Sequence, residues 1–371
     1  TNNLSNRNLI INGAMQVAQR GTSSTSDGYK TVDRFKSNFA GHDEAITQAQ
    51  VDLSSSDTPY SSGFRKAFKL TNGNQTSGTG AGDYAQMSYT IEAQDVANSG
   101  WNYTDSNSKL TLQFWAKSSV AKTFILSVYT QDGTDYAYNH KYALAANTWT
   151  KITHTFPGNS NLTFDNDNGI GIQFMWKMFV GTTYTSGSTV DQWVTYGGYT
   201  STPDDTDDWW TTNDATFELT GVQLEVGDVA TDFEHRSYAD ELRRCYRYCQ
   251  MDNASRSGDN YHWFAQGFSG GLNYAYFVID IPEPMRVTPS LVEAGIDAGS
   301  SSSDGNGMRI GHRTTSGLSV YAIDSASVNA SSTPERIMVY VSHVSSGTQG
   351  CNAALESYNN QTSYLLLEAE L

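Results

Sequence analysis

The segment from Gln192 to Thr212 carries the residues whose types and spacing best suit chemistry with a sugar. Its aromatic residues fall among Gly, Thr and Asp rather than at the alternating positions of a strand. Aromatic faces in exposed loops stack on the C–H patches of sugar rings, while carboxylates and amides bond the hydroxyls. Alternatively, these rings close the edge of a core or a subunit interface. The candidates are Trp193, Tyr196, Tyr199, Trp209 and Trp210.

A second candidate of the same kind is Trp101, which lies beside Tyr103 in a polar turn-like stretch. It offers the same aromatic surface with fewer neighbours able to bond a hydroxyl. We therefore add Trp101 to the predicted glycan-binding set.

Four aspartates in the first segment are candidate ligands of a metal ion. Ca²⁺ takes about 6–8 oxygen ligands from carboxylates and carbonyls, and closely spaced aspartates can provide several of them. The alternative is an acidic loop that simply stays solvated. Calcium is the one cofactor that the sequence raises, and the candidate ligands are Asp204, Asp205, Asp207 and Asp208.

Catalytic signatures are scarce in this sequence. It contains no GxSxG or HExxH motif, no Walker-type loop and no Cys and His set with zinc spacing. Cys245 and Cys249 lie one helical turn apart without a nearby pair of His, which favours packing over metal binding. A pair of carboxylates suited to glycoside hydrolysis is expected by chance among 39 acidic residues. The prediction is a protein that is not an enzyme.

Bulk composition restricts the class of protein further. The formal net charge of −16 argues against a nucleic-acid partner, because phosphate binding needs a surface rich in Lys and Arg. No apolar run is long enough to insert into a membrane. Three Cys are too few for a disulfide framework. Abundant Thr, Ser, Asn and Gly with scarce Lys favour an all-β fold.

Strands with period-two alternation follow one another between residues 28 and 230. In the clearest, alternate residues from Leu110 to Ala116 and from Ile170 to Met178 are apolar. Turns rich in Gly, Asn and Asp separate these strands, which predicts an antiparallel, jelly-roll-like sandwich similar to carbohydrate-binding modules. The other expected strands are 64–70, 84–91, 123–129, 149–156 and 217–226.

A short helix and a second β domain follow the sandwich. The stretch Ser237–Gln250 contains no Gly or Pro and spaces Tyr238, Leu242 and Cys249 at helical intervals, with Ser237 and Asp240 as an N-terminal cap. We expect residues 231–250 to connect the sandwich to a smaller C-terminal β domain at 251–371. Its expected strands are 261–268, 273–281, 318–323, 336–343 and 363–370.

Three short blocks in a fixed order resemble the tail-fibre and virion appendage proteins of bacteriophages. The first is NLIINGAMQVAQRGT at residues 8–22, followed by DRF at 33–35. The second is GVQLEVG at 221–227, which continues into ATDFEHRS and ELRRCYRYCQ. The third is IPEPMRVTPS at 281–290. Together the blocks bracket most of the chain.

This resemblance implies a structural protein of the virion, made in the host cytoplasm and commonly a homotrimer. It implies that the β domains face the host and attach to a surface glycan or receptor. A short tail fibre, a subunit of a composite fibre, a capsid-mounted fibre or decoration protein, and a virion-associated glycan-cleaving enzyme all remain open. A carbohydrate-binding module of a larger secreted enzyme would not explain the N-terminal block.

The resemblance also assigns a docking role to the N-terminal segment, residues 1–27, which would bind another virion protein. Leu9, Ile10 and Ile11 form an apolar run near a polar terminus, with Met15 a little beyond Gly13. Such a run is suited to packing on a neighbour. The alternative is that it is simply the first strand of the sandwich.

Overall fold

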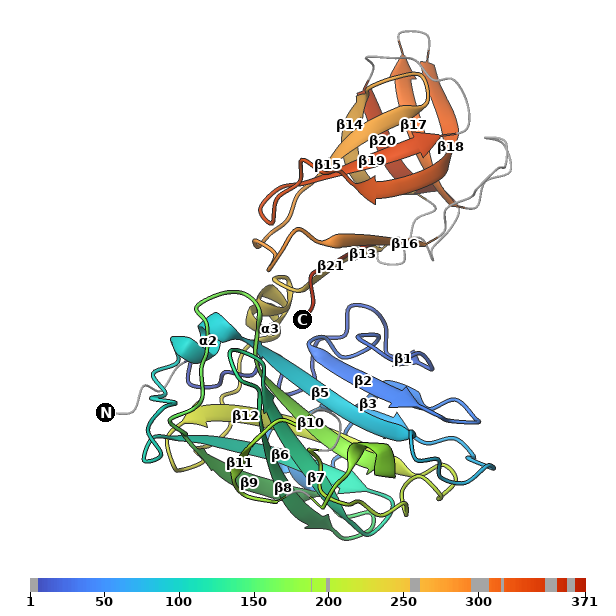
Figure 1. The fold of residues 1–371 in the computed structure, drawn as a ribbon. Helices are drawn as coiled ribbons and strands as arrows, with labels where there is room; N and C mark the ends of the chain where they lie inside the picture. The colour runs from blue at the N-terminus through green and yellow to red at the C-terminus, as the bar shows by residue number, and fades with distance from the viewer. Residues whose placement is uncertain are drawn as a thin grey trace. The chain divides into compact units, whose positions relative to one another are not determined.

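The computed structural model describes residues 6–187, 189–197, 201–253, 261–294, 307–314, 317–343, 352–358 and 364–371. Its contacts divide the chain into two units, Thr1–Leu242 together with Leu371, and Arg243–Glu370. Strands dominate both units and the described helices are short (Figure 1). The all-β prediction is therefore confirmed. Among the described helices none combines the length and apolar character needed to cross a bilayer.

The first unit contains two six-stranded antiparallel sheets, here named sheet A and sheet B. In spatial order, sheet A consists of β1 (Ser23–Ser24), β3 (Thr47–Asp52), β4 (Lys66–Thr71), β12 (Thr216–Val226), β6 (Lys109–Ser118) and β9 (Thr150–Pro157). Sheet B consists of β11 (Trp193–Thr195), β8 (Tyr136–Leu144), β7 (Lys122–Thr130), β10 (Ile170–Val180), β5 (Tyr84–Glu92) and β2 (Phe35–Ala40). The short helices of this unit are α1 (Thr58–Ser61), α2 (Ala93–Ala97) and the 3-10 turn η1 (Thr182–Tyr184).

Alternating apolar residues join the two sheets into a sandwich. Successive side chains of a strand point to opposite faces, so one set from each sheet meets in the middle. From sheet A, Leu112 and Phe114 of β6 are fully buried, and from sheet B so are Phe174 and Trp176 of β10. All four belong to one large core cluster to which both sheets contribute. The predicted sandwich and its expected strands are present, whereas β1, β2, β3, β8 and β11 were not predicted.

The second unit is a closed six-stranded barrel and a small sheet. The barrel runs in the order β14 (Tyr261–Ser269), β15 (Tyr274–Ile279), β19 (Ile337–His343), β18 (Gly317–Val328), β17 (Gly307–Thr314) and β20 (Asn352–Tyr358). The three-stranded sheet consists of β13 (Cys249–Asn253), β21 (Tyr364–Glu368) and β16 (Ser290–Ala294). Apolar side chains of both form one core. The predicted C-terminal strands are present, and β13, β16, β17 and β20 are additional.

The predicted helix at 237–250 is correct only in its first part. Helix α3 (Tyr238–Cys245) begins after Ser237, whose hydroxyl accepts a hydrogen bond from the Asp240 amide at 3.2 Å. The helix ends early because Cys249 pairs with Glu368 in β21 instead of continuing the turn. Strand pairing with a distant segment overrides the local helical spacing, so Cys249 is not part of an apolar stripe on the helix.

The N-terminal segment packs into the sandwich. Ile10 and Met15 have no exposed surface and belong to the sandwich core, while Leu9 and Ile11 are partly buried. The Leu9 amide donates to the carbonyl of Leu224 in β12 at 2.9 Å. The prediction that this segment docks on another protein is therefore wrong for Ile10 and Met15, because neither has a surface to offer.

Two glycines permit this close packing of the N-terminal segment on β12. A Cβ on Gly13 would lie 2.0 Å from the carbonyl oxygen of Val222, whose amide donates to Gly13 at 2.9 Å. Gly221 adopts φ +63°, in the left-handed region, and a Cβ there would meet the ring of Phe64 at 2.7 Å. The pairing of β12 is shifted at this point, which leaves room for the incoming segment.

A buried guanidinium fastens the N-terminal segment to the end of the sandwich. Arg236 donates to the carbonyl of Asn8 at 2.6 Å and to that of Ile10 at 3.2 Å. Its ion partners are the carboxylates of Glu234 at 3.0 Å and Glu241 at 2.9 Å. The three side chains are 7–10% exposed, so the charges are paired where water is largely excluded.

This network gives Glu234 a folded-state preference for the charged form. Burial of the carboxyl acts to raise its pKa, but the hydrogen bond from the Asn8 amide and the Arg236 charge outweigh burial and lower the pKa overall. The resulting stabilisation is complete above the unfolded-state pKa of about 4.3 and is lost as pH falls through the lower folded-state value.

We therefore predict that Glu234→Gln lowers the stability of the first unit at neutral pH and flattens its loss of stability between about pH 5 and pH 3. Urea unfolding followed by tryptophan fluorescence at several pH values measures both effects. Asp52→Asn is the control, because the Asp52 carboxylate is 81% exposed. Equal pH slopes in wild type and Glu234→Gln would contradict the assignment.

Candidate functional site

An open cleft lies on the outer face of sheet B, the face that points away from the sandwich core. The alternation that turns Phe174 and Trp176 of β10 inward turns Gln173, Met175 and Lys177 outward. The cleft has a volume of about 500 Å³. Its lining residues are Asn38, Tyr84, Gln86, Tyr129, Thr130, Gln131, Asp135, Gln173, Met175, Lys177, Val180, Tyr184, Tyr196 and Thr202.

Two pairs of tyrosines stand on either side of β10 in this cleft. Tyr129 of β7 contacts Tyr196, which follows β11, with ring centroids 4.7 Å apart. Tyr84 of β5 contacts Tyr184 of η1 edge to face at 5.5 Å. All four rings are partly exposed. The cleft is thus flanked by aromatic surface at both sides, with the floor formed by β10.

A buried lysine organises the wall next to the first pair. The ammonium of Lys177, a residue only 4% exposed, donates to the hydroxyl of Thr202 at 2.6 Å and to that of Tyr129 at 3.3 Å. The neighbouring carbonyl of Ser201 accepts a hydrogen bond from the Asn139 amide of β8 at 2.8 Å. These bonds hold the segment at 201–202 against sheet B, so the wall is preformed.

Hydrogen-bonding groups remain available on the cleft floor and rim. The side-chain amides of Gln86 and Gln131 have no partner among the described residues. Asp135 is the single carboxylate among the lining residues that the structure describes. Aromatic faces with free amides are the donor and acceptor set that suits a polyhydroxylated ligand, whereas the lining provides no pair of carboxylates for hydrolysis.

The structure places the predicted glycan-binding residues in very different positions. Tyr196 lines the cleft, and Tyr199 lies outside the described residues. Trp193 sits at the edge of the sandwich, where its indole donates to the carbonyl of Pro157 at 2.7 Å and its ring contacts Tyr138. It is partly buried against the core, so it holds the edge together.

The prediction that tryptophans form the stacking surface is wrong for Trp209, Trp210 and Trp101. Trp209 and Trp210 have no exposed surface and Trp101 has 3%, and all three belong to the sandwich core. The amide of Asn72 donates to the carbonyls of Trp209 and Trp210 at 3.2 and 2.7 Å, which fixes the turn that buries them. A sugar cannot reach rings in this position.

The candidate calcium ligands interact with different parts of the structure instead of converging on one point. Asp205 is buried against Lys122, with 2.9 Å between carboxylate and ammonium. Burial raises the pKa of Asp205, and the Lys122 charge acts against that rise. Asp204 accepts from the Gly187 amide at 3.2 Å. In the described part of the chain, the set Asp204, Asp205, Asp207 and Asp208 brings no three carboxylates together as a metal site would.

The described residues do bring three other metal-ligating side chains together, namely His140, His154 and Asp191. Sequence reasoning missed this cluster because its members come from β8, β9 and the loop before β11, with no recognisable spacing.

Sequence reasoning also missed the cleft, although the sequence contained one indication of it. The outward positions of the predicted strands at 84–91 and 123–129 carry no charged residue, and they include Tyr84, Gln86 and Tyr129.

Comparisons with known proteins give little beyond the fold. No protein-family model and no curated protein matches the sequence. The enzymatically active domain of tailspike protein 4 of bacteriophage CBA120 is 13% identical over 60% of this chain, at a TM-score of 0.31. The aligned part spans 22% of that tailspike chain.

Two further solved structures align with nearly their whole length. A putative sugar-binding protein of Bacteroides thetaiotaomicron is 11% identical, covering 59% of this chain and 100% of its own, at a TM-score of 0.30. The N-terminal cellulose-binding domain of Cellulomonas fimi β-1,4-glucanase C is 11% identical, covering 58% and 99%, at a TM-score of 0.28. Because these identities and TM-scores are low, the site is described from the geometry of this chain alone.

The burial of the tryptophans leads to a stability prediction. Trp209→Ala should lower the free energy of unfolding of the first unit by about 3–5 kcal/mol, because it leaves a large cavity in the core. Urea unfolding of the full chain measures the change. The control is Val229→Ala, at a residue of the same unit that is 67% exposed, which should stay within about 0.5 kcal/mol of wild type. A small effect of Trp209→Ala would contradict its burial.

Proposed function

We propose that the protein is a bacteriophage virion protein, a tail fibre or fibre-like appendage, whose sandwich binds a glycan of the host surface in the cleft on sheet B. The observation that carries the glycan part is the cleft itself, where two tyrosine pairs flank the β10 floor and the amides of Gln86, Gln131 and Gln173 line the cleft. The virion part is supported by the sequence blocks at 8–22 and 221–237. A capsid-mounted fibre or decoration protein would use the same cleft.

The size and openness of the cleft fit part of an extended sugar chain better than a small enclosed ligand. Its volume of about 500 Å³ lies within the range of roughly 300–1,000 Å³ of ligand sites. Stacking of a ring on a sugar contributes about 1 kcal/mol beyond the buried area. Each cleft is therefore expected to bind weakly, and several copies are needed for firm attachment.

The first test measures binding to a panel of purified bacterial surface polysaccharides by microcalorimetry. Tyr129→Ala removes one ring and should weaken binding by about five-fold, which corresponds to about 1 kcal/mol. Tyr238→Ala is the matched control, because Tyr238 is 53% exposed and lies outside the cleft. Melting temperatures separate loss of contact from loss of folding. If Tyr129→Ala and Tyr238→Ala bind the polysaccharide equally well, the cleft is not the glycan-binding site.

The same experiment separates binding from cleavage. We expect no new reducing ends after prolonged incubation with a polysaccharide that binds, since a non-enzymatic attachment protein leaves its receptor intact. Time-dependent release of reducing ends, abolished in Asp135→Asn, would instead establish a glycan-cleaving virion enzyme with Asp135 as one of its carboxylates.

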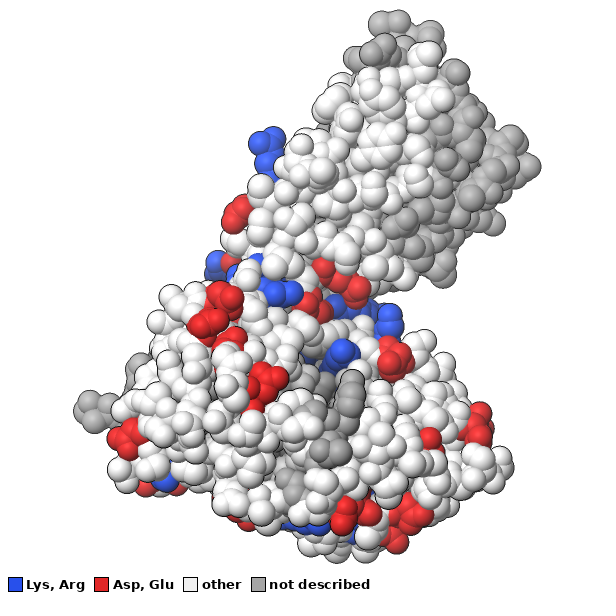
Figure 2. Space-filling view, in the orientation of Figure 1, with Lys and Arg blue, Asp and Glu red and all other residues white. Residues whose placement is uncertain are grey.

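A homotrimer is the assembly that we propose for this attachment role. Closed symmetry presents identical clefts side by side and multiplies weak affinities. The helical spacing of Tyr238, Leu242 and Cys249 suggested a trimer interface along α3. That interface is not available, because Cys249 lies in strand β13. Support comes from the second unit, where Trp263, Phe268, Leu272 and Val278 are 39–57% exposed. The described barrel surface visible in Figure 2 carries few charged side chains.

We predict that the purified chain has three times the mass of one chain by light scattering at micromolar concentration. The double variant Trp263→Ser with Phe268→Ser should shift it towards monomer, because exposed apolar patches of this kind mark interaction surfaces. Tyr238→Ser, an exposed aromatic of the first unit, is the control and should leave the mass unchanged. A wild-type monomer would exclude the trimer.

A further inference from the structure

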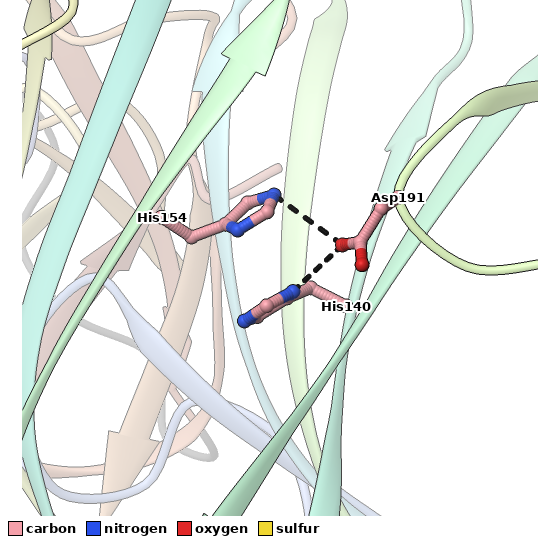
Figure 3. Close-up of side chains that lie close together, drawn as sticks. All are labelled: His140, His154 and Asp191. Atoms are coloured by element: carbon pink, nitrogen blue, oxygen red, sulfur yellow. Dashed lines mark hydrogen bonds and ion pairs between the residues drawn. The ribbon is translucent and has the colours of Figure 1, made fainter.

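One edge of the sandwich brings two histidines and an aspartate face to face. His140 lies on β8 of sheet B, and His154 lies on β9, the edge strand of sheet A. Asp191 lies in the loop that leads into β11. In Figure 3 one nitrogen of each imidazole points to the same carboxylate. The three side chains thus converge from both sheets and a connecting loop.

The three side chains lie close enough together to meet at one ion, and Asp191 is hydrogen-bonded to His140. Oδ1 of Asp191 is 2.7 Å from Nδ1 of His140 and 3.7 Å from Nε2 of His154. The two imidazole rings are stacked, with centroids 3.7 Å apart. One ligand atom from each residue lies within 4.8 Å of the other two. His140 and His154 are 20% and 14% exposed, which leaves a path for an ion to enter.

The backbone holds Asp191 in place independently of its side chain. Its φ is +59°, in the left-handed region that Asp tolerates better than most residues. Its amide donates to the carbonyl of Asn139, the neighbour of His140, at 2.8 Å. The carboxylate is therefore presented to the two imidazoles by a fixed turn, as a preformed ligand set requires.

We propose that His140, His154 and Asp191 bind one Zn²⁺ ion. Two imidazole nitrogens and a carboxylate oxygen form a common zinc ligand set, with bonds of about 2.0–2.2 Å and a water as the fourth ligand. A tetrahedron on such bonds has edges of about 3.4 Å, and the two O–N distances lie on either side of that value. Imidazole ligands disfavour Ca²⁺ and Mg²⁺, which prefer oxygen.

The ion has a structural role in this position. It joins β8 of one sheet to β9 of the other and ties down the loop before β11. Tyr138, whose hydroxyl is 3.2 Å from Nε2 of His154, gives up that hydrogen bond when the nitrogen binds zinc. None of the three ligands lines the glycan cleft. The zinc proposal therefore does not depend on the proposed function, and each can be tested without the other.

The test is a calorimetric titration of the full, untagged and metal-stripped chain with Zn²⁺ alone. Wild type should bind one ion per chain and gain melting temperature. Asp191→Asn and His154→Gln should each weaken binding by more than about 100-fold, above the loss typical of outer-shell partners. Tyr138→Phe should retain it, because it removes only the competing hydrogen bond. Co²⁺ in place of Zn²⁺ should show the visible absorption of a tetrahedral site.

A matched control identifies adventitious Zn²⁺ binding by a histidine–aspartate pair. His262 lies 2.9 Å from Asp252, the same pairing without a third ligand among the described residues. His262→Gln should leave Zn²⁺ binding unchanged. The proposal is overturned if wild type binds no Zn²⁺, if Asp191→Asn binds as wild type does, or if His262→Gln abolishes binding. Circular dichroism without metal verifies that each variant folds.

Discussion

The buried guanidinium of Arg236 is the interaction on which the first unit depends most. It binds the carbonyls of two residues near the N-terminus and two carboxylates from the far end of the sandwich sequence. A charge so poorly exposed is stable only when paired, and removal of one partner leaves the others uncompensated. The sandwich is thus closed by contacts between segments more than 200 residues apart in the chain.

This closure gives the first two of the quoted sequence blocks a shared structural role. Asn8, in the first block, accepts a hydrogen bond on its side-chain oxygen from the Leu224 amide of the second block. Gly13 and Gly221 remove the side chains that would keep the two segments apart. Further along the second block, Arg236 pairs with Glu234 and binds the backbone of the first block. The first two blocks are therefore parts of one packed structure, residues 8–13 against 221–236.

The closed sandwich then allows its outer face to specialise. Strand β10 sends Phe174 and Trp176 into the core and Gln173 and Lys177 into the cleft, so a single strand contributes to both the core and the cleft floor. A ring that stacks on a ligand must be exposed, whereas Trp176, Trp209 and Trp210 of the sandwich have no exposed surface. Tyrosine suits the exposed positions, because its hydroxyl keeps contact with water while the ring face stays available.

The sequence by itself determined the all-β class, the sandwich strands and the absence of familiar catalytic motifs, because period-two alternation and composition are local properties. It also located the cap of α3 at Ser237. Only the tertiary structure decided which aromatic residues line the cleft and which are buried. Trp209 and Tyr196 come from one polar segment, yet Asn72 fixes the turn that buries the first, while the second contacts the ring of Tyr129 in the cleft. The cluster of His140, His154 and Asp191 likewise arises from strands of two sheets meeting at one edge, which no spacing in the chain records.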